Sequence, residues 1–265
     1  MKGKVAVITG GNGTLGSAFA KGLAQAGARV FILGRNKEKS NSLITEMKQL
    51  GLDIEAVTCD VLNEEVVQSA CDEILEKAGR IDILVNGAGG NKKDATVMPD
   101  QSIFDTSLDA FREVFDLNLL GTVIPSFVFA KAMVKQGNGS IVNISSMAAQ
   151  LPLTRVVAYS ASKAAIDNFT KWLAIEVASK YGSDIRVNAI APGFFIADQN
   201  RSLLLKEDGS LTARGETIIS QTPAKRFGEP VELVSTLLWL CNENSAFVNG
   251  IVVPVDGGFS AFSGV

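Results

Sequence analysis

A tyrosine and a lysine stand four positions apart in the stretch AYSASKA, as Tyr159 and Lys163. Residues i and i+4 of a helix share a face, so both side chains can enter one cleft. A free phenol has a pKa of about 10, and one ammonium about 4 Å away at an effective dielectric of about 20 favours phenolate by about 4 kcal/mol. That is enough to make a tyrosine an acid or base near neutral pH. The chain has no histidine, so a Ser-His-Asp or Cys-His triad is excluded and this pair is the candidate for proton transfer.

A glycine-rich loop near the N-terminus, TGGNGTLG at residues 9–16, follows an apolar run and precedes a helical pattern. Glycines permit a tight turn and close approach of the backbone to a pyrophosphate, and the helix N-terminus offers free N–H groups to the anion. The segment also fits the GxGxxG pattern of dinucleotide-binding proteins. We therefore expect a dinucleotide cofactor to contact the following residues: Gly10, Asn12, Gly13, Thr14, Leu15 and Gly16.

The second apolar run ends in LGRN, which bears on the choice of cofactor. An acidic residue at this point would bind the ribose hydroxyls and select NAD. Here Gly34 stands in that place and Arg35 follows, and an arginine can pair with a 2′-phosphate through its planar fork of donors. NADP(H) is favoured and NAD(H) is possible; the alternative for Arg35 is a solvated surface side chain.

Short apolar runs alternate with helical patterns along the whole chain. Seven runs are candidate strands: KVAVITG, RVFILGR, IEAVTCD, IDILVNGAG, SIVNISS, IRVNAIAPG and GIVVPVDGG. Strands this uniformly apolar are typical of a parallel sheet covered on both sides. The sequence predicts one α/β domain over residues 1–265, a doubly wound Rossmann-type fold with about seven parallel strands and helices on both faces. Two stretches that break the rhythm, 90–106 and 194–222, follow strand ends and are the expected substrate loops.

Composition excludes several classes of function. The net charge is −3 and no basic stripe carries interleaved aromatic residues, so we expect no nucleic-acid partner. No apolar run reaches the roughly 20 residues that span a bilayer, and MKGKVAVITG lacks the features of a signal peptide, so we expect a cytoplasmic protein without membrane contact. Cys59, Cys71 and Cys241 are scattered and odd in number, so no metal site is expected.

Seven features resemble the short-chain dehydrogenase/reductase family over essentially the full length. They are TGGNGTLG (9–16), CDV (59–61), NGAG (86–89), Asn118 in FDLNLLG, Ser146, the YxxxK of Tyr159 and Lys163, and APG (191–193). The resemblance implies that Tyr159 delivers or removes the hydroxyl proton and that Ser146 hydrogen-bonds the substrate oxygen. It implies that Lys163 lowers the pKa of Tyr159 and holds the nicotinamide ribose, and that Asn118 anchors a water in a proton relay.

The same resemblance implies further cofactor contacts. They would come from Asp60, Val61, Asn86, Gly87, Ala88, Gly89, Pro192 and Gly193, together with Tyr159 and Lys163. Two residues depart from the family pattern: Thr14 replaces a glycine of the usual loop, and Gly87 replaces an asparagine of the usual NNAG. Both lie in the cofactor motifs, so we expect them to affect cofactor affinity more than hydride transfer.

Finer motifs resemble the D-mannonate oxidoreductase, or fructuronate reductase, branch of the family. They are NGAGGN, APGFF, QNR and the tail VPVDGGFSAFSGV. The resemblance implies reduction of D-fructuronate to D-mannonate, and related reactions such as that of gluconate 5-dehydrogenase stay open. Candidate partners of the substrate carboxylate are Lys92, Lys93, Arg155 and Arg201, and candidate partners of its hydroxyls are Asn91, Gln150, Gln199 and Asn200. For each of these a solvated surface role is the alternative.

A different class of function is a dinucleotide-binding sensor or scaffold that has lost catalysis. Such proteins usually lack the tyrosine or the lysine, whereas this chain has Asn118, Ser146, Tyr159 and Lys163. The sequence therefore favours an NAD(P)-dependent enzyme that acts on a CH–OH group of a small sugar acid. The family resemblance also implies a homotetramer, or a homodimer.

Overall fold

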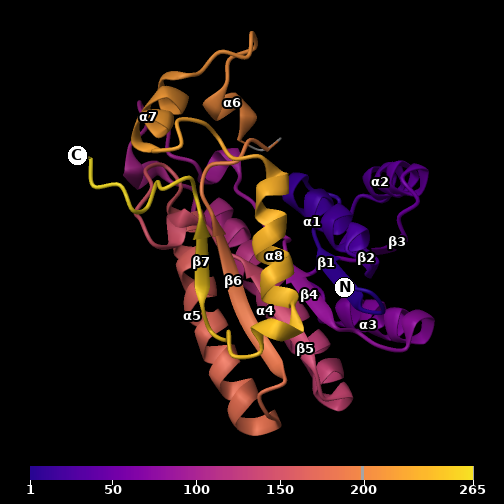
Figure 1. The fold of residues 1–265 in the computed structure, drawn as a ribbon. Coiled ribbons are helices and arrows are strands. Elements are labelled where there is room, and N and C mark those ends of the chain that lie inside the picture. Colours follow the sequence, from indigo (N-terminus) through magenta and orange to yellow (C-terminus); the bar gives the residue numbers. More distant parts are fainter. Residues whose placement is uncertain (198–199, 265) are drawn as a thin grey trace.

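A parallel sheet of seven strands forms the centre of the computed structural model, which describes residues 1–197 and 200–264 (Figure 1). The strand order is β3-β2-β1-β4-β5-β6-β7. The bounds are β1 Val5–Thr9, β2 Arg29–Gly34, β3 Ile54–Thr58, β4 Ile83–Asn86, β5 Gly139–Ile144, β6 Ile185–Pro192 and β7 Val252–Val255. This confirms the predicted fold class, including the seven strands.

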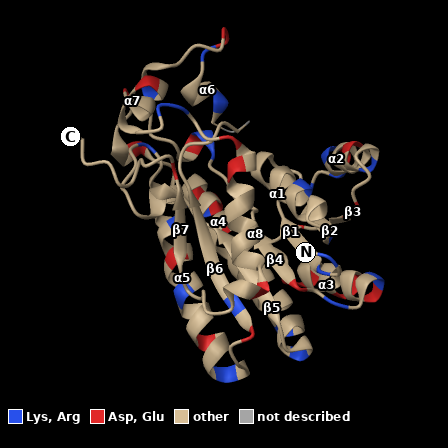
Figure 2. Cartoon of the chain, in the orientation of Figure 1, with Lys and Arg blue, Asp and Glu red and all other residues tan. Residues whose placement is uncertain are grey.

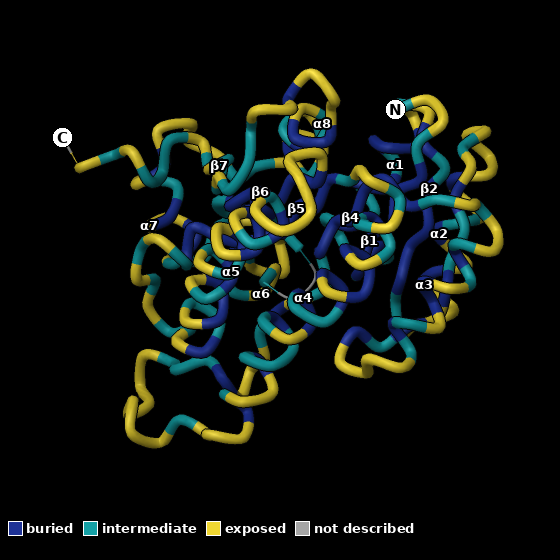
Figure 3. The backbone as a smooth tube through the Cα atoms, turned by 90° about the horizontal axis from the view of Figure 1, so that it is seen from below, coloured by how far each residue is buried: buried dark blue, intermediate teal, exposed yellow. Residues whose placement is uncertain are grey.

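Helices cover both faces of the sheet because its strands are apolar on both sides. On one face, side chains such as Val7 and Phe31 pack against α3 (Glu64–Ala78), α4 (Leu108–Gln136) and α5 (Val157–Tyr181). On the other face, Ile8 and Ile32 pack against α1 (Thr14–Gln25), α2 (Lys37–Gln49) and α8 (Val234–Cys241). Every residue of β1 and β6 is buried, and Figure 3 shows the central strands inside a layer of partly exposed helices.

The strand order reverses between β1 and β4, which lie side by side although β2 and β3 intervene in sequence. The connections that leave the carboxyl ends of β1 and β4 therefore pass to opposite faces of the sheet. Such a switch point leaves a crevice, and doubly wound folds bind their ligands there. The glycine loop follows β1 and the NGAG motif follows β4, so the fold brings both to this crevice.

Helix α4 is long and apolar. By length and composition it could cross a membrane, since an 18-residue window within it has a mean hydropathy of 1.6. Half of that window is buried in the protein, against α5 and the sheet. The apolar composition of α4 follows from this packing, because a helix that lies between a sheet and another helix is apolar around most of its circumference.

A chain of buried polar side chains connects α4, the sheet and α5. Asn86 of β4 donates through Nδ2 to Ser126 Oγ of α4 and to Asn143 Oδ1 of β5, both at 2.8 Å. Asn143 in turn donates to Thr170 Oγ1 of α5 at 2.9 Å. Buried polar groups of this kind are favourable only when paired, so these bonds select one relative placement of the two long helices.

The two expected substrate loops contain short helices that the sequence pattern did not indicate. The segment 194–222 forms α6 (Arg201–Leu204) and α7 (Ala213–Gln221) in its described part, and the segment 90–106 forms the 3₁₀ turns η1 (Lys93–Ala95) and η2 (Ile103–Asp105). Thr212 caps α7 by accepting a bond from Gly215 N at 3.1 Å. Three further 3₁₀ turns are η3 (Met147–Ala149), η4 (Pro230–Leu233) and η5 (Glu243–Ser245).

Candidate active site

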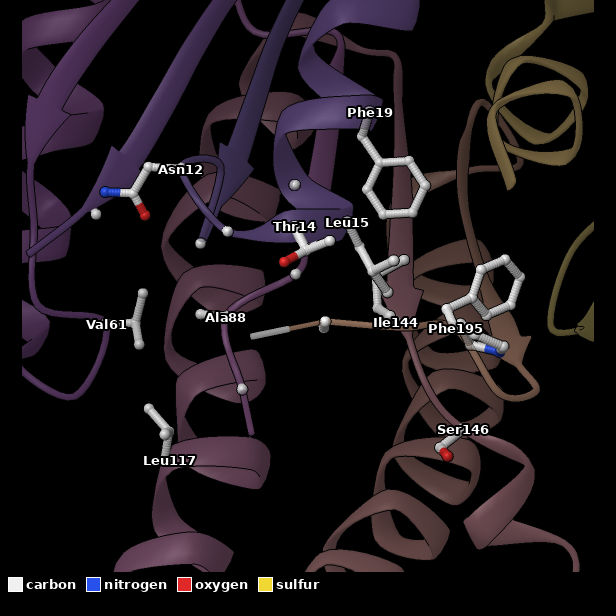
Figure 4. A pocket seen from close by; sticks show the side chains of 18 of the residues that line it. Asn12, Thr14, Leu15, Phe19, Val61, Ala88, Leu117, Ile144, Ser146 and Phe195 are labelled. Carbon is white, nitrogen blue, oxygen red and sulfur yellow. The ribbon is translucent and has the colours of Figure 1, made fainter. Parts of the chain in front are cut away.

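A cavity of about 380 Å³ lies at the carboxyl ends of β1 and β4, at the switch point of the sheet (Figure 4). Most of the predicted cofactor residues line it: Gly10, Asn12, Gly13, Thr14, Leu15, Gly16, Arg35, Val61, Gly87, Ala88, Gly89, Tyr159, Pro192 and Gly193. Further lining comes from residues for which the sequence predicted no contact: Phe19, Leu33, Lys39, Cys59, Leu117, Ile144, Ser145, Phe195 and Ala197. Glycine backbone, apolar side chains and polar side chains thus line the crevice together.

The glycine loop has the geometry of a phosphate cradle. Gly10 has φ +65°, and a Cβ at that position would lie 2.9 Å from the backbone of Ala88. At Gly16 a Cβ would lie 2.2 Å from the Gly10 carbonyl oxygen, so α1 can pack against the loop only with glycine there. Gly13 is the N-cap of α1 and supplies no capping side chain, which leaves the first N–H groups of the helix available to an anion. The residues present therefore fit the pyrophosphate of a dinucleotide.

The end of β2 is closed by the side chain of Asn12. This side chain donates to Ser40 Oγ at 2.8 Å and to the Asn36 carbonyl oxygen at 3.1 Å. A Cβ on Gly34 would lie 2.7 Å from Asn12 Nδ2, so Asn12 fills the space that an acidic residue at position 34 would use. Arg35 and Lys39 line the cavity beside it. The sequence feature that could have indicated a cavity position for Lys39 is its place four residues after Arg35, near the start of α2.

The second departure from the family pattern, Gly87, also has a steric cause. A Cβ there would lie 2.9 Å from the Thr9 carbonyl oxygen, and Gly87 N donates to Thr9 Oγ1 at 3.1 Å. The end of β4 is thus held close against β1. Thr14, the first departure, begins α1 and lines the cavity.

Three predicted cofactor residues lie outside the cavity lining. Asn86 is buried in the polar chain between α4 and β5, with its Oδ1 atom unpaired. Asp60 accepts a bond from Leu62 N at 3.1 Å and so shapes the turn after β3, while its neighbours Cys59 and Val61 face the cavity. Lys163 is buried behind Tyr159. We therefore expect Asp60 and Asn86 to act through the positions of their neighbours.

Ser146 and Tyr159 meet at the wall of the cavity. Ser146 starts η3 after β5, where its Oγ accepts a bond from Ala148 N at 3.1 Å, and Tyr159 lies in the first turn of α5. The two side chains share a hydrogen bond, which lowers the phenol pKa, but burial has the larger effect and raises the pKa of Tyr159 above its ordinary value. The phenol therefore stays protonated at neutral pH in this geometry and can donate its proton.

Lys163 is placed differently from the expectation. Its Nζ donates to the Ile144 carbonyl oxygen at 2.7 Å and lies 5.5 Å from the centroid of the Tyr159 ring. Burial lowers the pKa of Lys163 to about 8, with Asp167 opposing that shift. The ammonium lies over the ring and is directed at a backbone oxygen, and the lowering of the Tyr159 pKa by Lys163 stays a prediction.

Asn118 holds the loop after β4 against α4. Its Nδ2 donates to the carbonyl oxygens of Gly90 and Val114 at 2.7 Å each, and its Oδ1 accepts from Gly90 N at 3.1 Å. A Cβ on Gly89 would lie 2.6 Å from Asn118 Oδ1 and 3.5 Å from Lys163 Nζ. Asn118 and Lys163 thus converge on Gly89. Both Nδ2 hydrogens of Asn118 are used by these backbone groups, and its role in a water relay stays a prediction.

The predicted substrate residues divide into two groups. Ser146 and Asn200 line the cavity, although Asn200 bonds its own loop through Phe195 O at 2.9 Å and Ala197 N at 2.8 Å. Asn91 donates to Thr96 Oγ1 at 2.8 Å, and Gln150 bonds the carboxylate of Asp167, so neither amide faces the cavity. Gln199 lies outside the described residues.

The predicted cations also differ in their surroundings. Lys92 forms an ion pair with Glu113, and Lys93 and Arg201 are exposed. Arg155 is partly buried two residues before the start of α5, four residues from Tyr159. None of these four cations lines the cavity itself.

The family model described as short chain dehydrogenase matches residues 4–208. This chain belongs to the short-chain dehydrogenase family. The dehydrogenase is 47% identical to the uncharacterized oxidoreductase UxuB of Bacillus subtilis, with 100% of this chain and 98% of that protein covered. It is 37% identical to the 2-dehydro-3-deoxy-D-gluconate 5-dehydrogenase of Formosa agariphila, at 100% and 95% coverage. The chain is a nicotinamide-dependent oxidoreductase of this family.

Two solved structures are similar to the dehydrogenase. One is a candidate D-mannonate oxidoreductase from Haemophilus influenza with bound NAD, at 46% identity and a TM-score of 0.91, covering 100% of this chain and 98% of that one. The other is a gluconate 5-dehydrogenase from Burkholderia cenocepacia in complex with NADP and tartrate, at 32% identity and a TM-score of 0.87, with 98% and 96% coverage. Both likenesses extend over the loops around the cavity as well as the sheet.

The geometry assigns distinct tasks to the groups around the cavity. A bound nicotinamide supplies or accepts the hydride in this family. Tyr159 holds the proton that a substrate oxygen gains on reduction, and Ser146 orients the phenol and can donate to the same oxygen. Lys163 provides a buried positive charge next to the phenol, and Phe195 and Leu117 give the cavity apolar walls.

Proposed function

We propose that this dehydrogenase interconverts a keto group and a hydroxyl group of a sugar acid, and that its substrate pair is D-fructuronate and D-mannonate. The observation that carries the proposal is the full-length likeness, at a TM-score of 0.91, to the candidate D-mannonate oxidoreductase. The relatives that act on 2-dehydro-3-deoxy-D-gluconate or gluconate support the broader class, since their substrates also combine one carboxylate with several hydroxyls.

Two other functions remain as alternatives. The gluconate 5-dehydrogenase reaction fits the same catalytic groups, since it also oxidises the hydroxyl at carbon 5 and gluconate differs from mannonate only in its configuration at carbon 2. A non-catalytic dinucleotide sensor is disfavoured by the hydrogen bond between Ser146 and Tyr159, because a protein without turnover has no need of an oriented proton donor.

The experiment follows NADPH or NADH consumption with D-fructuronate, 5-ketogluconate and D-fructose. D-fructose is the matched uncharged ketose, because it carries a CH₂OH group in place of the carboxylate of fructuronate. We expect kcat/KM to be highest for fructuronate, with D-fructose at least tenfold lower, because a charge-assisted contact contributes roughly 1.5–3 kcal/mol. Turnover of 5-ketogluconate without any of fructuronate would instead establish the alternative sugar acid.

For the cofactor we propose that NADP(H) is preferred and NAD(H) is accepted. Arg35 and Lys39 line the cavity beside the end of β2, and Asn12 occupies the space of the acidic residue that would repel a 2′-phosphate. The two similar structures contain one cofactor each, NAD in one and NADP in the other, so both occur among relatives.

Arg35→Ala should lower the ratio of kcat/KM for NADPH over NADH by about tenfold, because the guanidinium fork is lost while the adenosine contacts remain. The matched control is Lys48→Ala, which removes one exposed positive charge from the far end of α2. A wild-type preference for NADH, or an unchanged ratio in Arg35→Ala, would refute the proposed phosphate contact.

We also propose self-association and a cytoplasmic location. Exposed apolar side chains gather on α4 and α5, where Phe127 and Trp172 have centroids 6.4 Å apart and Ile175 is 65% exposed. A patch of this kind is typical of a subunit interface, and we expect the molar mass from light scattering to be that of a tetramer or dimer. The three cysteines are buried and unpaired, which fits a reducing compartment; cell fractionation tests the location.

A further inference from the structure

Two arginines lie on neighbouring segments near the catalytic end of the sheet. Arg155 is the second residue before α5, and Arg214 lies in the first turn of α7. Arg214 donates from Nη1 to Thr154 Oγ1 at 3.3 Å and from Nη2 to the Thr154 carbonyl oxygen at 3.4 Å. These bonds hold α7, from the segment 194–222, beside the segment that leads into Tyr159. Figure 2 shows α7 beyond the carboxyl end of the strands, with a basic residue on the helix.

A third segment is fixed to the same place. The backbone N–H of Val97, in the loop 90–106, donates to the Arg155 carbonyl oxygen at 2.9 Å. Arg155 itself has φ +77°, a left-handed conformation that is uncommon for a residue with a side chain. The surrounding bonds therefore hold Arg155 in a strained backbone conformation, and residues held in this way cluster at ligand sites.

The charges of these arginines are not neutralised by the protein. Among the described residues, Arg29, Arg80, Arg112 and Arg226 each form an ion pair with a carboxylate. No such pair is formed by Arg155 or Arg214 within residues 1–197 and 200–264. Burial and the positive charge of Arg155 both lower the pKa of Arg214, so the two guanidinium groups repel each other in partly desolvated surroundings. An anion bound between them would remove this repulsion.

We propose that Arg155 and Arg214 together bind the carboxylate of the sugar-acid substrate. The inference rests on the proposed function and names the residues that would make the enzyme select an acid over a neutral ketose. Two planar guanidinium groups match the two oxygens of a carboxylate, and their partial burial strengthens the contact. Arg155 lies outside the cavity lining, four residues before Tyr159, so we place the carboxylate at the edge of the cavity and the rest of the sugar toward Ser146 and the phenol.

The experiment compares Arg155→Gln and Arg214→Gln with the wild type on D-fructuronate and D-fructose. We expect each variant to raise KM for fructuronate at least tenfold and to lower the acid-to-neutral ratio of kcat/KM by the same factor. The activity on D-fructose should stay within about twofold. Arg214→Lys should be intermediate, since it keeps the charge but loses the fork. Lys206→Gln is the matched control, because it removes one exposed charge from the same loop.

A readout without turnover completes the test. Binding of D-mannonate to the complex with NADPH should weaken at least tenfold in both glutamine variants, as measured by calorimetry. An unchanged ratio of kcat/KM for fructuronate over D-fructose in either variant would overturn the inference, and it would leave the proposed reduction of fructuronate unaffected. An equal loss on acid and neutral substrates would show that Arg214 only positions Thr154, and it would overturn the inference too. The wild type could instead prefer a different sugar acid, with the ratio of kcat/KM for that acid over D-fructose at least tenfold lower in the variants. That result would refute D-fructuronate as the substrate and support the carboxylate site.

Discussion

Tyr159→Phe is expected to remove at least about 99% of turnover and to leave the affinity for NADPH nearly unchanged. The phenyl ring keeps its packing at the start of α5, but the proton that a substrate oxygen gains on reduction is gone. General acid catalysis typically contributes 10²–10⁴-fold. Steady-state kcat and the Kd of NADPH, from quenching of protein fluorescence, measure the two quantities separately.

The chain supplies a matched control, because Tyr181 is its other tyrosine and ends the same helix in an exposed position. Tyr181→Phe should retain wild-type turnover. If Tyr159→Phe also retained it, Tyr159 could not be the proton donor. A large loss of NADPH affinity in Tyr159→Phe would mean that the hydroxyl holds the cofactor as well.

Lys163→Met is expected to reduce kcat at least a hundredfold and also to weaken cofactor binding, while it stabilises the fold at neutral pH. The ammonium is buried next to the phenol and Gly89, so catalysis and the cofactor site both lose its charge. Methionine has a similar length and no desolvation cost. A loss of rate without any loss of cofactor affinity would contradict a contact between Lys163 and the cofactor.

The stability effect has a defined pH dependence. The pKa of Lys163 is about 8 in the folded protein, below its ordinary value of 10.5, so folding disfavours the charged form. The penalty is fully present below pH 8, where lysine is charged in both states, and it disappears as pH rises from 8 to 10.5. The penalty is on the order of 3 kcal/mol. Lys163→Met removes this penalty but also removes the hydrogen bond to the Ile144 carbonyl oxygen, which contributes about 1 kcal/mol to stability.

Urea unfolding of the wild type and Lys163→Met at pH 7 and pH 9.5 tests this sign. The variant should be more stable by about 2 kcal/mol at pH 7, and the advantage should fall by about 2 kcal/mol at pH 9.5. The difference between the two proteins removes the titration of all other groups. An advantage that stayed constant or grew with pH would show that Lys163 is not buried as a strained charge.

The sequence predicted the sheet and the glycine loop well because both depend on local patterns. Strands buried on two faces are apolar runs, and β1 followed by TGGNGTLG places the loop at the end of a strand whatever the rest of the chain does. The crevice between β1 and β4 follows from the strand order of a doubly wound sheet. Most of the predicted cofactor residues therefore line one cavity.

Contacts between distant segments could not be predicted in this way. Gln150 turned toward Asp167, and Arg214 came to Thr154 across 60 residues, because the fold of the substrate loops decides which side chains meet. The position of Lys163 over the Tyr159 ring also depends on its hydrogen bond to the Ile144 carbonyl oxygen at the end of β5. The i, i+4 spacing of the two residues gives no information about that strand.

The side chain of Asn12 limits the mutational routes by which this chain could come to prefer NAD. A change of Gly34 to aspartate, made first, brings a Cβ within 2.7 Å of Asn12 Nδ2 and forces out a side chain that is held by Ser40 and Asn36. If Asn12 first becomes glycine, the space beside β2 opens and the aspartate can follow. The same two substitutions thus have opposite prospects in the two orders, and the change at position 12 has to come first.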